Sequence, residues 1–228
     1  MAISVDRVYQ TVLALANKEQ RGYITPQEFN LFANHAQLEI FDQYFHDLDQ
    51  AKRRPGNQSN YGDKVGMIQD KINNYIINSG SFDLESNSGS YQLPSKQWHS
   101  IASASVDGIP AEKLDREVQH VYRTALLKPN KSKPIFYILN NSVQFNPNKG
   151  TANLSFIRKP TSPNWAYVVI GDKPMYDPSR SIDFDLHVSE EKDLVVKIAQ
   201  LCGVSIKDFA LTQAAGAKES SIIQQEKV

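Results

Sequence analysis

The sequence contains a single cysteine, Cys202, and it has neither a long apolar run nor an excess of either charge. One thiol excludes a disulfide framework or a multi-cysteine metal site within the chain, and it fits a reducing cytoplasm. No apolar run approaches the roughly 20 residues that span a bilayer. The opening MAISVDRVYQ lacks the apolar core of a signal peptide. We therefore expect a soluble protein without membrane contact, made in a cytoplasm.

The formal net charge is zero, because the chain has 25 Lys and Arg residues and 25 Asp and Glu residues. A dedicated nucleic-acid-binding protein is expected to be clearly basic, so this class is disfavoured. A neutral protein also has little electrostatic protection against self-association. That property suits a subunit of an assembly better than a free monomer.

The common catalytic motifs are also missing: the chain has no Gly-Lys-Ser/Thr phosphate loop, GxGxxG, HExxH or GxSxG. Asp42, His46 and Asp49 are spaced to share one helix face, which could suit a metal ion, but only one of them is an imidazole. A solvated helix face is the favoured interpretation. His35 on the same helix has no acidic or thiol neighbour in sequence and is interpreted as a boundary residue.

Two further candidate sites also have a plainer interpretation. Cys202 follows Leu201 on an apolar helix and is expected to be a buried, inert thiol. His187, Asp183 and Asp185 could serve acid–base chemistry. Their alternation with apolar residues instead indicates a short strand with its polar side chains facing outward.

Two basic clusters could contact a phosphate backbone. They are Lys52, Arg53 and Arg54, and Lys128, Lys131 and Lys133. No aromatic residues interleave with these lysines as a base-stacking platform would need, so we predict at most non-specific contact with DNA. We expect no catalytic, cofactor-binding or metal-binding residues, no cofactor and no enzymatic activity.

Hydrophobic periodicity divides the chain into three zones and predicts an α+β protein with N-terminal helices, a central antiparallel β-rich region and C-terminal helices. Residues 1–78 are helical, with a long helix from about 25 to 50. Residues 79–182 are β-rich, with one helix near 115–126. Residues 183–228 form C-terminal helices and a polar tail, and they pack on the N-terminal helices.

The long helix has the clearest start signal. Thr25 supplies a capping hydroxyl, Pro26 occupies the first helical position and Glu28 completes a capping box. Apolar residues then recur every three or four positions along about 24 residues, or roughly 36 Å. Ser4 is expected to cap a helix before it. A further helix carrying Val65, Ile68, Ile72, Tyr75 and Ile76 is expected to follow.

In the middle of the chain, short apolar runs between turn residues predict strands. These are residues 82–84, 90–93, 101–106, 135–139, 143–146 and 154–157. Asn140-Asn141 lies between two of them and predicts a hairpin turn, because asparagine tolerates positive φ. Near the end, we expect Ser189 to cap a helix that stops at Gly203, with another short helix starting at residues 205–208.

Both ends of the chain resemble structural proteins of tailed bacteriophages. The segment VYQTVLALANKEQRGYITPQEFNLFANHAQLEIF resembles an opening found in structural proteins of marine and gut phages, including crAss-like phages. The stretch IDFDLHVSEEKDLVVKIAQLCGVSIKD and the closing QQEK are similar to the end of the same group. Between them, YQLP and PIFYILNNSVQFNPNKGTANLSFIRKP are similar in layout to head-to-tail adaptors of short-tailed phages.

This resemblance implies a ring-forming adaptor, or head-to-tail connector, in the neck or tail of the virion. Such a subunit would form a homo-oligomeric ring of about twelve copies beneath the portal, contact neighbouring ring and tail proteins, and line part of the DNA channel. The resemblance implies no catalytic residues. The alternatives are another neck or tail component of the same virion, a small metal-dependent hydrolase using Asp42, His46 and Asp49, and a DNA-binding packaging accessory using the basic loops.

Overall fold

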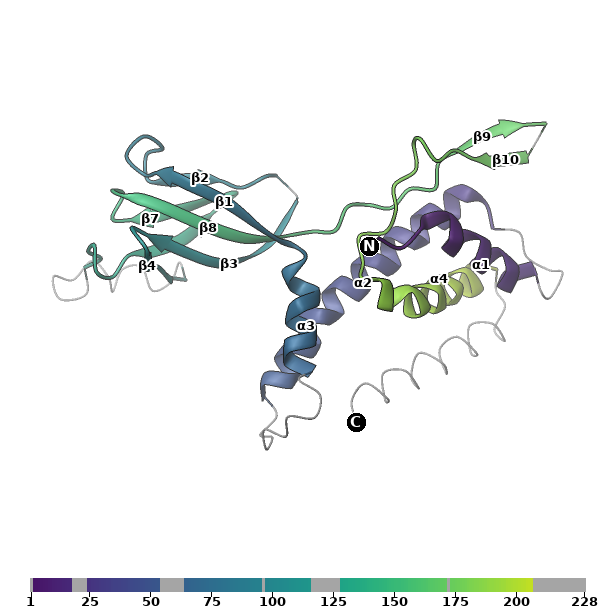
Figure 1. The fold of residues 1–228 in the computed structure, drawn as a ribbon, viewed down its shortest axis with the longest axis horizontal. Coiled ribbons are helices and arrows are strands. Elements are labelled where there is room, and N and C mark those ends of the chain that lie inside the picture. Colours follow the sequence, from purple (N-terminus) through teal and green to yellow (C-terminus); the bar gives the residue numbers. More distant parts are fainter. Residues whose placement is uncertain are drawn as a thin grey trace. The chain divides into compact units, whose positions relative to one another are not determined.

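The computed structural model describes residues 2–17, 24–53, 64–95, 97–115, 128–171 and 173–206. It contains helices before and after a set of mainly antiparallel strands, so the predicted α+β class is confirmed (Figure 1). The chain forms two compact units, Met1–Ile68 with Pro160–Val228, and Gln69–Lys159. We call them the helical unit and the strand-rich unit. None of the described helices is both long and apolar enough to cross a membrane.

The helical unit is built on α1 (Val5–Asn17), α2 (Pro26–Arg53) and α4 (Glu191–Ile206). Helix α4 packs against both α1 and α2. Each helix contributes one apolar face to a common core, as expected for amphipathic helices. The fully buried members include Val5, Val8, Val12, Phe29, Phe41, Leu194 and Ile198. At 28 residues, α2 spans about 42 Å, somewhat longer than predicted.

The predicted capping box of α2 is confirmed. The Thr25 hydroxyl accepts a hydrogen bond from the Glu28 N–H at 3.3 Å, and the Thr25 N–H donates to Glu28 Oε2 at 3.0 Å. Hydrogen bonds from the Thr25 backbone and side chain lower the pKa of Glu28. Ser4 caps α1 in a similar way, because its hydroxyl accepts from the Arg7 N–H at 3.4 Å.

Replacing the capping threonine should therefore weaken the helical unit. We expect Thr25→Ala to lower the free energy of unfolding by about 1 kcal/mol, because an N–H at the helix start loses its acceptor. Chemical denaturation followed by circular dichroism measures the change. Thr11→Ala is the matched control, since Thr11 is exposed within α1 and alanine is the better helix former. A Thr25→Ala protein as stable as the Thr11→Ala protein would contradict the cap's role.

The strand-rich unit contains two four-stranded sheets, ordered β1-β8-β3-β4 and β2-β7-β6-β5. The first has β1 (Ile76–Asp83), β8 (Thr151–Arg158), β3 (Trp98–Val106) and β4 (Ile109–Pro110). The second has β2 (Ser90–Gln92), β7 (Ser142–Asn146), β6 (Ile135–Leu139) and β5 (Glu112–Lys113). Residues of both sheets form one buried cluster that includes Val106, Leu154, Phe156, Phe136, Val143 and Phe145. The sheets therefore pack face to face as a small sandwich.

The strands predicted from residues 90 to 157 are confirmed within a few residues of their ends. The hairpin at Asn140-Asn141 is also confirmed: β6 pairs antiparallel with β7, and Asn140 has φ 55°. The run at residues 82–84 is the end of a longer strand, β1. That strand begins at Ile76, which we had placed in the preceding helix; α3 (Lys64–Asn73) ends before it. The β-branched pair Ile76-Ile77 favours the extended conformation.

Three expectations near the C-terminus are wrong. Residues 182–188 do not form the predicted strand. They make only isolated bridges, in which Ile182 pairs with Asn164 and Phe184 pairs with Ile3. The helical segment starts earlier than Ser189, with His187 as the cap of a 3-10 turn, Val188–Glu190. Helix α4 continues through Gly203 to Ile206, since one glycine costs a helix only about 1 kcal/mol and packing outweighs it.

The two-unit division also places residues 160–182 with the helices, whereas the sequence grouped them with the strands. Within them lies a separate two-stranded sheet, β9 (Tyr167–Ile170) and β10 (Lys173–Tyr176). The predicted helix near 115–126, the further short helix predicted to start at residues 205–208 and the polar tail lie largely or wholly outside the described residues.

Candidate functional site

The residues weighed as a metal site lie on the exposed side of α2. Asp42, His46 and Asp49 are all exposed. His46 Nε2 lies 3.4 Å from Gln50 Nε2, and its Nδ1 lies 3.6 Å from an Asp47 carboxylate oxygen. Over the described part of the chain, no three His, Cys, Asp or Glu side chains gather closely enough to hold a metal ion. His35 is likewise exposed on α2.

The single thiol lies inside the helical unit. Cys202 is buried in α4, and burial, with a smaller contribution from the Glu28 charge, raises its pKa to about 12. The thiolate is the reactive form, so the group is inert at neutral pH. The prediction of a buried thiol is confirmed.

This environment predicts slow chemistry at the thiol. The folded protein at pH 8 should react with a disulfide reagent such as dithionitrobenzoate at least about a hundredfold more slowly than the denatured protein, because little thiolate forms. Release of the coloured thiol product measures both rates. Stoichiometric reaction of the folded protein within seconds would contradict the buried placement.

Asp183, Asp185 and His187 each accept a hydrogen bond from a backbone N–H. Asp183 and His187 are exposed and Asp185 is half-buried, so these polar side chains lie at the surface, as expected, and also fix the backbone. Asp183 Oδ1 accepts from the Val5 N–H at the start of α1 at 2.9 Å. Asp185 Oδ2 accepts from the Thr161 N–H at 3.2 Å. His187 Nδ1 accepts from the Ser189 N–H at 3.3 Å. The Asp183 bond ties this segment to α1 and the Asp185 bond ties it to Thr161, whereas the His187 bond is local.

A glutamine that the sequence analysis missed completes this attachment. Gln37 lies on the buried face of α2 and is fully buried. Its Nε2 donates to the Thr161 carbonyl at 2.7 Å, and its Oε1 accepts from the Asp185 N–H at 2.9 Å. The sequence did contain a signal for this residue. Gln37 is a polar residue within the apolar stripe of α2, beside the buried Ala36 and Ile40.

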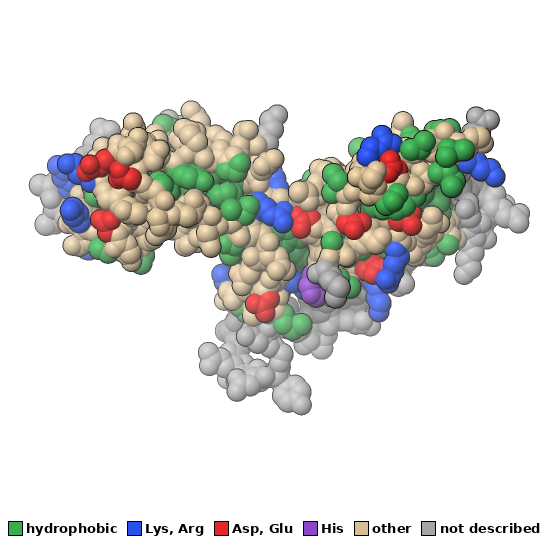
Figure 2. Space-filling model, turned by 45° about the horizontal axis from the view of Figure 1, so that its top comes forward, with side chains coloured by type: hydrophobic (Ala, Val, Ile, Leu, Met, Phe, Trp, Pro, Cys, Tyr) green, Lys and Arg blue, Asp and Glu red, His purple; other side chains and the backbone are tan. Residues whose placement is uncertain are grey.

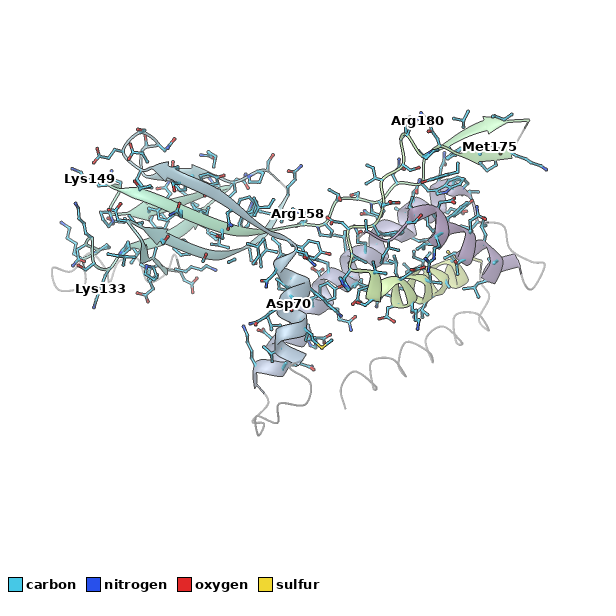
Figure 3. All side chains as sticks on the ribbon, viewed as in Figure 1. Asp70, Lys133, Lys149, Arg158, Met175 and Arg180 are labelled. Carbon is cyan, nitrogen blue, oxygen red and sulfur yellow. The ribbon has the colours of Figure 1, made fainter. Side chains whose placement is uncertain are left out.

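The basic residues do not form a uniform positive surface. Lys128, Lys131 and Lys133 are exposed before β6, and Figure 3 shows Lys133 at the same end of the strand-rich unit as Lys149. Acidic residues share this end. Glu112 pairs with Ile135 directly after the lysine loop, and Asp107 accepts the Thr151 N–H at 2.8 Å. Of the other cluster, Lys52 is exposed on α2, and the Arg53 and Arg54 side chains lie outside the described residues.

The most distinctive surface is the β9–β10 hairpin, whose register separates two faces. Val168 pairs with Met175, and Ile170 pairs with Lys173, so these four side chains share one face. Val168, Ile170 and Met175 are 45%, 64% and 54% exposed. Figure 2 shows hydrophobic side chains gathered over this part of the helical unit. We call these three residues the outer apolar face.

The opposite face of the hairpin is anchored on a buried tryptophan. Tyr167 and Tyr176 stack on the Trp165 ring, with centroids 5.8 and 5.7 Å away. The Trp165 ring also packs on Tyr9 of α1, with centroids 4.3 Å apart, and its Nε1–H donates to Asp6 Oδ1 at 2.9 Å. The hairpin therefore stands on the core of the helical unit while its outer apolar face stays in solvent.

The loop after β10 adds a second attachment. Asp177 accepts hydrogen bonds from Ser179 and Arg180, and these lower its pKa to about 2. Arg180 also donates to the Tyr167 carbonyl at 3.3 Å. Figure 3 shows Arg180 and Met175 near the same hairpin. No strand was predicted in this segment, although the apolar run YVVI followed by Gly-Asp is a hairpin signal.

Comparison with known proteins adds no relative: no protein-family model matches the chain, and no curated protein matches it significantly.

Proposed function

We propose that this protein is a non-enzymatic structural subunit of a tailed bacteriophage virion. In this role it forms a ring, in about twelve copies, as a head-to-tail adaptor below the portal and forms part of the DNA channel. Its partners are the portal, neighbouring ring and tail proteins, and DNA passing through without sequence recognition. It is made in the cytoplasm of the bacterial host and resides in the neck or tail of the particle.

One observation carries the proposal. The two segments that resemble phage structural proteins, residues 8–41 and 182–208, are separated by more than half of the chain, yet their described parts join in one compact unit. Phe184 pairs with Ile3, Asp183 accepts the Val5 N–H, and α4 packs on α1 and α2. The resembling segments are thus the parts of one structural unit.

The physical properties of the chain support an assembly role. A ring subunit makes a head-to-tail contact and so needs two different complementary surfaces. The helical unit offers a rigid capped helix and an exposed hairpin, and the strand-rich unit offers exposed loops of mixed charge. The balanced net charge leaves no long-range repulsion between copies.

A density map of the particle's neck tests this proposal. We expect α2 and the sandwich of the strand-rich unit to fit density directly below the portal, repeated around the axis in about twelve copies. A different axial position or copy number would replace the adaptor role with the alternative, another neck or tail component of the same virion. Density at the neck that excludes this fold would contradict both.

A further inference from the structure

The hydrogen-bond pattern of the β9–β10 hairpin shows which backbone groups face outward. The Asp177 N–H donates to the Ala166 carbonyl at 2.9 Å, so the residue pair at the base is a hydrogen-bonded one. Antiparallel pairs alternate between hydrogen-bonded and non-bonded. The pairs Val168–Met175 and Ile170–Lys173 are therefore bonded, whereas the amide and carbonyl of Val169 point away from β10.

The two outer edges of this hairpin differ. Pro174 lies opposite Val169, and its ring removes the outward donor on the β10 edge. The β9 edge keeps its outward donor at Val169, and among the described residues β10 is the only strand paired with β9. A two-stranded sheet is marginal in water, and an apolar edge strand is a template for another strand. On this edge the Tyr167 carbonyl already accepts from Arg180 at 3.3 Å, so Val169 is the position at which β9 can accept another strand.

We infer that β9 pairs antiparallel with β9 of a second copy, with Val169 opposite Val169 of that copy. The pairing makes a continuous four-stranded sheet whose outer apolar faces join, placing Val168 of one copy beside Ile170 of the other. A two-fold contact of this kind is self-complementary and is the commonest one between identical chains.

The charges of the hairpin and of the whole chain do not oppose a second copy as the occupant. Lys173 is the only charged residue among the four that share this face. Antiparallel pairing puts the two lysines at opposite corners of the sheet, at least three strand spacings or about 14 Å apart. That separation exceeds the screening length in physiological salt, so the lysines do not repel appreciably. The neutral chain adds no long-range repulsion.

This contact does not rest on the virion proposal. A two-fold pair closes on itself, so a ring needs a second, different contact in addition. Self-association can be measured on the purified full chain without portal or particle. Failure of either proposal therefore leaves the other standing.

Sedimentation velocity of the full chain across a concentration series tests the pairing. We expect a monomer–dimer equilibrium, and we expect Val169→Pro to weaken dimerisation roughly tenfold or more, because two symmetric hydrogen bonds are lost. The hairpin's own bonds survive, since this N–H points outward. Met67→Gln is the control. Met67 is 63% exposed on α3, away from the hairpin in sequence, and its replacement should leave dimerisation unchanged.

A cysteine substitution gives a second, geometric test. Opposite residues of a bonded antiparallel pair have Cα atoms about 5.5 Å apart, which suits a disulfide. Val169→Cys should therefore crosslink rapidly under mild oxidation, and Val188→Cys, 44% exposed elsewhere, should not. The buried Cys202 does not compete. A wild-type chain that stays monomeric, a dimer unaffected by Val169→Pro, or equal crosslinking of the two cysteine variants would overturn the inference.

Discussion

Trp165→Ala should lower the free energy of unfolding of the helical unit by about 3–5 kcal/mol. The substitution removes a side chain that is 2% exposed and that contacts α1 and the two tyrosines at the hairpin base. Tyr9 loses one ring contact, and Tyr167 and Tyr176 lose the surface on which they stack. The loss should also free the hairpin from its base, so dimerisation through β9 should weaken with it.

Chemical denaturation followed by circular dichroism measures this effect without relying on the removed fluorophore. Trp165→Phe is the control that keeps an aromatic ring but removes the N–H bonded to Asp6. We expect it to cost about 1 kcal/mol, the usual net value of one hydrogen bond, in addition to a small packing loss. An alanine variant no less stable than the phenylalanine variant would show that Trp165 does not anchor the hairpin.

Gln37→Leu should cost about 2–4 kcal/mol, although it replaces a buried polar side chain by an apolar one of similar size. The cost arises because the Thr161 carbonyl and the Asp185 N–H each lose the partner that the buried amide supplies. Leucine and glutamine have similar helix propensities, so the backbone of α2 contributes little to the change.

Gln27→Leu is the matched control, since Gln27 is exposed near the start of the same helix. It should change the free energy of unfolding by less than about 0.5 kcal/mol. The two variants are compared by urea unfolding under identical conditions. Equal stabilities would mean that residues 160–185 are held by contacts other than the Gln37 amide.

Local signals in the sequence explain why much of the fold was predictable. The capping box at Thr25 uses residues within four positions, so it identifies the start of α2 without tertiary information. The β6–β7 hairpin is equally local, because Asn140 supplies positive φ between two apolar strands. Both features form between residues that are close in sequence, so they depend little on how the rest of the chain packs.

The segment from 160 to 189 shows why the rest was not predictable. Its residues are placed by partners more than a hundred positions away, as in the Asn30–Trp165 and Gln37–Asp185 bonds. The alternating apolar residues 182–188 predicted a strand. In the structure they pair only through single bridges, and His187 caps the following 3-10 turn. Periodicity reports which side chains are buried, and it does not report what buries them.

The candidate surface was missed for a related reason. A run such as YVVI indicates a buried strand by composition, whereas the structure leaves Val169 and Ile170 more than half exposed. Exposure of this kind is a property of the whole unit, since Trp165 supports only one face of the hairpin. Apolar side chains left on a supported edge are typical of interaction sites.

Quantitative mass spectrometry of purified phage particles tests the central claim most directly. We expect peptides of this chain in particles freed of unassembled protein, at about one copy for each portal subunit. Its absence from intact particles that contain the portal would contradict a structural role in the virion.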